Sequence, residues 1–225
     1  MIFIDPKLWA VARGTPIGNV DVGDIAQLRE NLVPVDYIVV HHGLPSSMYD
    51  TSCDGTWLLR KDIAENRAWD SGNSNALETS GIQAYLNGDW MNRYDSDVVQ
   101  AVKRIKIPYC VGGGSAAVNS GANGLSCKIF LPSVYEVGLS TSDDPNIPQD
   151  GAKLAYFDPG TGSSANSKRV ANFNNSAYYW WLRSPVTINS LGAWFISSDG
   201  SCKNNICSVL FGIRPALILP SDFVI

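Results

Sequence analysis

The chain has 225 residues, of which 45% are hydrophobic and 10% aromatic, and its formal net charge is −4. This length fits one large domain, and we expect residues 1–225 to form it. The acidic balance without clustered Lys and Arg argues against a nucleic-acid surface. We also expect no membrane insertion, because no apolar run has the length of a membrane helix, and no secretory signal.

The N-terminal part of the chain combines irregular segments with two strands. Residues 1–34 are expected to be irregular, because Pro and Gly interrupt any periodic pattern. Residues 35–43 are rich in Val and Ile and end at a glycine, which predicts a buried strand. Residues 56–63 predict a second strand, and the polar segment that follows, from residue 65 to residue 80, resembles a loop.

Two helices are predicted next. Ser80 can cap a helix over residues 81–94, where Ile and Leu side chains recur on one face. Asp95 can cap a second helix over residues 96–105, which carries a stripe of Val and Ile. These are the clearest helical signals in the chain.

The second half is richer in strands. A short strand over residues 106–112 leads into a Gly-rich run that lacks the G-K-[ST] ending of a phosphate-binding loop. Residues 126–138 predict a strand and a short turn, and residues 139–177 form a long polar loop of the kind that is functional or decorates a surface. Apolar segments from residue 177 to residue 220 predict further strands. Helices that come early and strands that come late favour an α+β fold.

The cysteine and histidine residues give no metal pattern. The five cysteines are an odd number, which argues against a complete disulfide framework. His41 and His42 are adjacent on a predicted strand, so their side chains point to opposite faces. With no C-x-x-C pair present, we predict that the protein holds no metal and no cofactor.

Five blocks, taken in order, resemble one family of proteins from gut Firmicutes and their phages. They are GTWLLRKDIAENRAW (55–69), AYLNGDWMNRYDSDV (84–98), VNSGANGLSCKIFLPSVYEVG (118–138), WWLRSP (180–185) and GIRPALIL (212–219). That family in turn is similar to the C-type-lectin-fold variable proteins of diversity-generating retroelements. The resemblance implies a C-type-lectin-like fold, similar to the formylglycine-generating enzymes, with two helices and small, mainly antiparallel sheets.

The same resemblance implies a variable ligand-binding region over residues 178–215. In such proteins the codons of a C-terminal stretch are rewritten at adenines, and Asn codons are the richest starting points. The segments that have this character are 178–179, 186–190, 197–201, 203–206 and 208–211. We predict that the ligand contacts are Tyr179, Thr187, Asn189, Trp194, Ser198, Lys203, Asn205 and Phe211.

The residue types support this division between contacts and framework. Tyr, Trp, Ser and Asn are common in antibody binding loops, because aromatic rings give contact area at low entropy cost and short polar side chains adapt. Trp180 and Trp181 are adjacent, so one is expected in the core and the other at a surface. Arg183 and Arg214 are expected to donate hydrogen bonds inside the protein. Trp194 fits either a contact or a core residue.

The expected function is therefore binding and not catalysis. The ligand would be a bacterial surface protein or glycan, and the protein would sit on a phage virion, such as its tail, or on a bacterial cell surface, with assembly into a virion or a homo-oligomer. No E-P-N, Q-P-D or W-N-D triplet is present, so calcium-dependent sugar binding is not expected. Two alternatives remain: a cysteine oxidase that uses Cys202 and Cys207, and a structural virion component.

Overall fold

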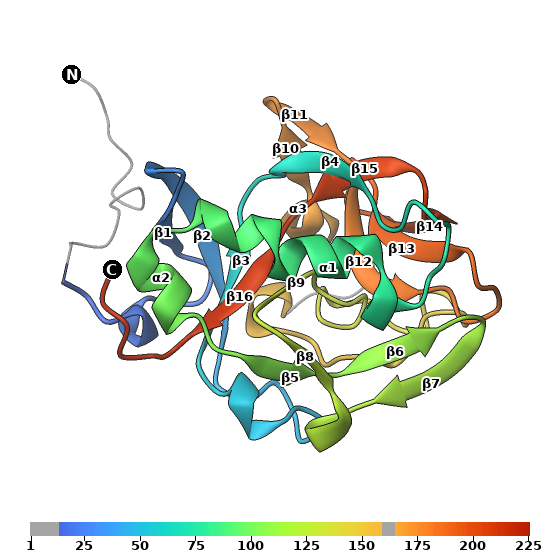
Figure 1. Cartoon of the computed structure of the whole chain (residues 1–225), viewed down its shortest axis with the longest axis horizontal. Helices are drawn as coiled ribbons and strands as arrows, with labels where there is room; N and C mark the ends of the chain where they lie inside the picture. Colours follow the sequence, from blue (N-terminus) through green and yellow to red (C-terminus); the bar gives the residue numbers. More distant parts are fainter. Residues whose placement is uncertain (1–13, 159–164) are drawn as a thin grey trace.

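Small β-sheets and a few short helices make up the computed structural model, which describes residues 14–158 and 165–225. The mixture is mostly β and agrees with the α+β class expected from the sequence (Figure 1). Almost all strand pairs are antiparallel, as expected, and the exception among the described residues is the pair β12–β15.

One five-stranded sheet joins the two ends of the described chain. Its strands follow the order β1-β2-β3-β16-β9, and their bounds are Ile25–Glu30, Val33–His42, Thr56–Arg60, Ala216–Leu219 and Ile129–Phe130. The expectation that residues 1–34 are irregular is wrong over β1, where alternate side chains are buried against the core. The β1–β2 turn needs only Asn31 and Leu32, both with positive φ.

A second five-stranded sheet holds most of the C-terminal third. Its order is β14-β13-β12-β15-β4, and the bounds are Cys202–Ile206, Gly192–Ile196, Trp180–Pro185, Leu210–Ile213 and Glu65–Ala68. Strand β4 lies in the segment expected to be a loop. Its residues are polar, but they pair along their whole length with β15.

Three two-stranded sheets complete the strands. They are β5–β8 (Ile105–Ile107 and Leu125–Cys127), β6–β7 (Tyr109–Gly112 and Ser115–Asn119) and β10–β11 (Ala171–Phe173 and Ser176–Tyr178). The Gly-rich run is the turn of the β6–β7 hairpin, and its three glycines have positive φ. A Cβ atom at Gly112 would also lie 2.0 Å from the backbone oxygen of Asn75, so this position excludes side chains.

The two predicted helices are present but short. Helix α1 spans Gly81–Asn87, and the amide of Gln83 donates to the Ser80 hydroxyl at 3.3 Å, as the capping pattern predicts. It ends at Gly88, and the rest of the predicted segment continues as a 3-10 helix. Helix α2 spans Ser96–Ala101 after Asp95, whose side chain makes no capping hydrogen bond.

Other helical turns are brief. Helix α3 spans Asn166–Arg169 within the long polar segment. The described 3-10 turns are Ile17–Asn19, Thr51–Cys53, Leu77–Thr79, Asp89–Arg93, Gly121–Asn123 and Ala155–Phe157. No helix in residues 14–158 or 165–225 combines the length and the apolar character needed to cross a membrane.

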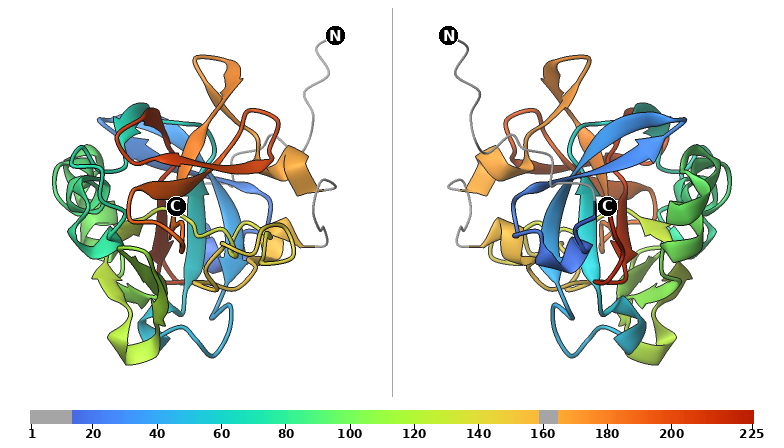
Figure 2. Two further views of the ribbon diagram at one scale, coloured as in Figure 1. Left: turned by 90° about the vertical axis from the view of Figure 1, so that its right-hand side faces the viewer. Right: turned by 90° about the vertical axis from the view of Figure 1, so that its left-hand side faces the viewer.

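The sheets stand between the helices α1 and α2 on one side and the segment that follows β9 on the other (Figure 2). The buried hydrophobic residues form one cluster that runs from Ile17 to Leu219. Trp57, Trp69, Trp90, Trp180 and Trp181 are among its largest fully buried side chains. The two five-stranded sheets therefore share a core, and that core fixes the position of the C-terminal strands.

Candidate ligand-binding face

Four of the eight predicted contact residues lie on one face of the second sheet. The register places Trp181 opposite Phe195 and Phe195 opposite Lys203. Directly opposed residues of neighbouring strands share a face. Asn205 is opposite Ala193, which alternates onto the same face as Phe195. The ring of Phe211 packs against Phe195 on that face. We call this the aromatic face, formed by Tyr179, Trp181, Phe195, Lys203, Asn205 and Phe211.

The rings of the aromatic face form a continuous cluster. Phe211 is central, with ring centroids 5.3 Å from Tyr179, 4.8 Å from Trp181 and 4.5 Å from Phe195. Tyr179 and Phe195 meet edge to face at 5.8 Å. Aromatic pairs at such distances each contribute roughly 0.5–1.5 kcal/mol beyond the area they bury, so the cluster is a firm platform.

The side chains of the aromatic face differ in how far they are exposed to solvent. Lys203 and Asn205 are exposed on the edge strand β14, and Tyr179 and Phe211 are half-buried. Trp181 and Phe195 are buried beneath them. A ligand on this face would meet two partly exposed rings beside an ammonium group and an amide, a combination suited to protein or glycan surfaces.

Thr187 and Asn189 lie in the β12–β13 loop at one end of this sheet and act partly as structural residues. The Asn189 side-chain oxygen accepts hydrogen bonds from the amides of Leu191 at 2.9 Å and Gly192 at 2.8 Å. The Thr187 hydroxyl donates to the Asn146 carbonyl at 3.1 Å. Their side chains also shape the loop, and their predicted role as ligand contacts stays a prediction.

Asn75 holds this loop from beneath and was not identified from the sequence. Its side chain is fully buried, and its amide nitrogen lies 2.9 Å from the Asn189 carbonyl oxygen and 2.8 Å from that of Gly192. Its side-chain oxygen accepts from the Gly113 amide at 2.7 Å. Nothing in the sequence distinguishes Asn75 from the other Asn residues of its polar segment.

The last two predicted contacts lie elsewhere. Ser198 is half-exposed in the β13–β14 turn, at the other end of the strands. Trp194 alternates with Phe195 along β13, so it points to the opposite side of the sheet and is only 2% exposed. The structure thus places Trp194 among buried residues and away from the aromatic face.

Sequence reasoning missed four exposed apolar side chains near this end of the sheet. Leu191 and Ile206 are neighbours across the sheet end, because the Cys207 amide donates to the Leu191 carbonyl at 2.8 Å. Ile188 and Leu210 follow in the adjoining loop and strand, and all four side chains are exposed. Clustered apolar residues of this kind are typical of interaction surfaces.

Strand β12 carries the framework residues of the site. Its six residues are all buried, so the expectation that one of Trp180 and Trp181 lines a surface is wrong. Phe195 and Phe211 cover Trp181 on the aromatic face. The Trp180 indole nitrogen donates to the Arg169 carbonyl at 2.9 Å, and that of Trp181 donates to Arg67 at 3.1 Å.

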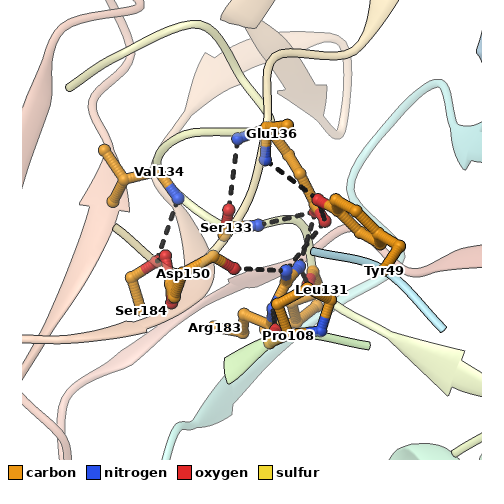
Figure 3. Close-up of polar contacts among 10 residues, drawn as sticks. Tyr49, Pro108, Leu131, Ser133, Val134, Glu136, Asp150, Arg183 and Ser184 are labelled. Atoms are coloured by element: carbon orange, nitrogen blue, oxygen red, sulfur yellow. Dashed lines mark hydrogen bonds and ion pairs between the residues drawn. The ribbon is translucent and has the colours of Figure 1, made fainter. Parts of the chain in front are cut away.

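Arg183 ties β12 to the segment after β9, as Figure 3 shows. Its guanidinium group forms a buried ion pair with Glu136, in which Nη1 lies 2.5 Å from Oε2 and Nη2 lies 2.7 Å from Oε1. It also donates to the carbonyl oxygens of Leu131 at 3.1 Å and Asp150 at 2.9 Å. The expectation that Arg183 is an internal donor is confirmed.

Asp150 completes this polar cluster. It is fully buried, and its Oδ1 atom accepts from the Ser184 hydroxyl at 2.9 Å. Its Oδ2 atom has no hydrogen-bond partner among the described residues. Burial raises the pKa of this carboxyl group to about 6, against the attraction of Arg183.

Arg214 is the second internal donor expected from the sequence. Its Nε atom donates to the Arg60 carbonyl at 2.7 Å, and its guanidinium carbon lies 5.0 Å from the centroid of the Trp180 ring. Burial lowers its pKa to about 10. Gly212, close by, leaves no room for a side chain, because a Cβ atom would lie 2.7 Å from the Tyr179 carbonyl oxygen.

The geometry does not bring Cys202 and Cys207 together. Both thiols are free, and they stand at the two ends of β14. Five extended residues span about 16 Å, well beyond the reach of a disulfide. Burial raises the pKa of each thiol to about 12, which opposes formation of the reactive thiolate.

Comparison with known proteins identifies one family. Residues 54–221, roughly three quarters of the chain, match the family described as "Domain of unknown function (DUF6273)". No curated protein and no solved structure matches the chain. The matched segment includes the whole aromatic face and its Arg183 support, and the chain belongs to the DUF6273 family.

Proposed function

We propose that the protein binds a protein or glycan on a bacterial surface through its aromatic face. The observation that supports this is the meeting of Tyr179 and Phe211 with Lys203 and Asn205 of β14 over a buried aromatic base. A rigid scaffold that presents exposed side chains of varied chemistry is a common plan for recognition.

The proposal includes a C-type-lectin-like scaffold and diversification by a retroelement. What supports it is the separation of roles along the C-terminal region. The framework residues Trp180, Arg183 and Arg214 are buried, while Lys203 and Asn205 are exposed. Codons for exposed positions can change without loss of the core, because exposed substitutions usually alter stability by only about ±0.5 kcal/mol. On this proposal the protein acts on a phage virion or a bacterial cell surface.

Sequencing of the gene and its flanks in several isolates tests the diversification. We expect a near-identical repeat of the region that encodes residues 178–211, with differences confined to adenines. A region that varies at all bases alike, or does not vary, would contradict this part of the proposal.

Binding to a panel of bacterial strains tests the face itself. We expect the combined variant Lys203→Ala and Asn205→Ala to lose attachment while it keeps its melting temperature, because both residues are exposed on β14. Arg104→Ala removes one positive charge from an exposed site outside the aromatic face and serves as the matched control. Equal attachment of both variants would refute the assignment of this face.

A further inference from the structure

A separate cavity lies on the other side of strands β13 and β14. Its volume is about 250 Å³, and its lining includes Trp194 and Cys202. Both side chains alternate with the residues of the aromatic face along their strands. The cavity is therefore distinct from the proposed binding face, and its contents can be tested separately.

The buried part of the cavity lining is apolar except for one hydrogen-bond donor. Leu139, Ile147 and Trp194 are buried there. The indole Nε1 atom of Trp194 has no hydrogen-bond partner among the described residues. Buried donors are nearly always paired, so a bound group that offers an acceptor would satisfy this nitrogen.

The rim of the cavity is acidic. Asp143 and Asp144 both line it, and no Lys or Arg does so among the described residues. Each carboxylate uses one oxygen within its own loop: Asp143 accepts from the Ser140 amide and Asp144 from the Asn146 amide, both at 2.8 Å. A second oxygen of each carboxylate is left for a ligand.

A basic residue, Arg169, lies behind this acidic rim. Arg169 is buried behind the rim residue Asn166, to whose side-chain oxygen it donates at 2.6 Å. The charge of Asp143 acts on its guanidinium group. Among the described residues that line this cavity, acidic side chains are present and basic ones are not, which favours a ligand with a positive charge.

We propose that this cavity binds a small organic ammonium that carries a hydrogen-bond acceptor next to its charged nitrogen, such as an α-amino group followed by an amide carbonyl. The ammonium group donates to Asp143 and Asp144, and the carbonyl accepts from the indole of Trp194. The aliphatic part packs on Leu139 and Ile147. The volume lies just below the usual range for ligand pockets, about 300–1,000 Å³, so the cavity accommodates one residue-sized molecule.

Three matched probes test the proposal by isothermal titration calorimetry on the full chain at neutral pH. Leucinamide has both the charge and the carbonyl, isoamylamine has the same alkylammonium without the carbonyl, and N-acetylleucinamide has the carbonyl without the charge. We expect leucinamide to bind about tenfold more tightly than isoamylamine, the effect of one hydrogen bond. N-acetylleucinamide should show no measurable binding.

Variants then assign the two interactions. Trp194→Phe keeps an aromatic side chain but removes the indole N–H donor, so the affinity for leucinamide should fall to that for isoamylamine. Asp144→Asn should weaken both amines and reduce the salt dependence of their binding. Asp21→Asn makes the same charge change at an exposed site outside the cavity and should alter neither affinity.

Clear outcomes would overturn the proposal. Absence of leucinamide binding, or equal binding of all three probes, would do so on the unmodified protein, even if a variant failed to fold. Binding of galactose in preference to leucinamide would identify a polyhydroxyl site in its place. Leucinamide binding that is unchanged in both Trp194→Phe and Asp144→Asn would place the amine elsewhere.

Discussion

At the scale of single residues, Asp150 is the group whose environment has the largest consequence for pH dependence. It is buried beside Arg183 and Ser184, with Glu136 in the same cluster, and its pKa is raised to about 6. An unfolded chain has an Asp pKa of about 3.9. The native state therefore holds a proton on Asp150 at pH values where the unfolded state has already released it.

This difference predicts a pH-dependent contribution to stability. The stability that Asp150 contributes is complete below about pH 4, where both states hold the proton, and is lost as the pH rises through about 6. The pKa difference of about two units makes this loss roughly 3 kcal/mol in the free energy of unfolding. In urea unfolding from pH 4 to pH 7.5, Asp150→Asn should gain stability relative to the unmodified protein as the pH rises. Other titrating groups largely cancel in this comparison. A difference between the two proteins that does not vary with pH would contradict the prediction.

Two asparagines of the candidate region provide a matched test of structural and contact roles. Asn189 accepts two backbone hydrogen bonds within its loop, whereas Asn205 accepts only from the amide of the next residue, Ile206, on an exposed edge strand. We expect Asn189→Ala to lower the free energy of unfolding by about 1–2 kcal/mol. Asn205→Ala should change it by no more than about 0.5 kcal/mol. Equal effects in chemical denaturation would show that Asn189 does not shape the loop.

At the scale of elements, strand β12 determines where the candidate face can lie. The strand is buried on both sides, with the Arg183 network on one end and the aromatic cluster over Trp181. Its neighbours β13 and β15 carry Phe195 and Phe211 in fixed positions against it. Substitutions in β12 therefore act on the core first and on binding only as a consequence.

Truncation of the two tryptophans tests this role. Trp180→Ala and Trp181→Ala should each cost roughly 3–5 kcal/mol, as expected for a buried aromatic residue. The indole hydrogen bonds to the carbonyls of Arg169 and Arg67 would also be lost. Thermal and urea unfolding measure both. If Trp181→Ala costs less than about 1 kcal/mol, the packing of Trp181 does not support the core.

The elements that the sequence predicted are those with local signals. The Ser80 cap identified the start of α1, and the apolar run identified β2. Strand β4 could not be found in this way, because its residues are polar and it forms a strand by pairing with β15 far along the chain. Strand β1 had a usable signal, the alternation of IAQLRE, which the flanking Pro and Gly residues obscured.

The residues of the candidate site likewise include some that the sequence predicted and some that it did not. Tyr179, Lys203 and Phe211 were predicted as contacts from the resemblance and from residue type. The structure places them on the aromatic face, and their role as ligand contacts stays a prediction. Trp194 was undecided, since choosing its side requires knowledge of which face the core covers. Asn75 escaped notice because its partners are backbone atoms more than a hundred residues away.

At the scale of the whole molecule, the two halves of the chain are interleaved. The first sheet combines β1, β2 and β3 with β16 and β9, and the second combines β4 with four C-terminal strands. The pairs β5–β8 and β6–β7 also join the halves. The aromatic face thus belongs to a sheet whose edge strand β4 comes from the N-terminal half.

Cleavage of the chain near residue 112, in the turn of the β6–β7 hairpin, tests this dependence. Neither fragment should fold alone: the N-terminal fragment loses β16 beside β3, and the C-terminal fragment loses β4 beside β15. Each would expose apolar surface that the shared core buries in the intact protein. We expect no cooperative thermal transition from either fragment by circular dichroism, and recovery of one transition when the two are mixed, because the cut removes only a turn. A cooperative melt of one fragment by itself would show that the chain contains an independent domain, and the single-domain prediction for residues 1–225 would then be wrong.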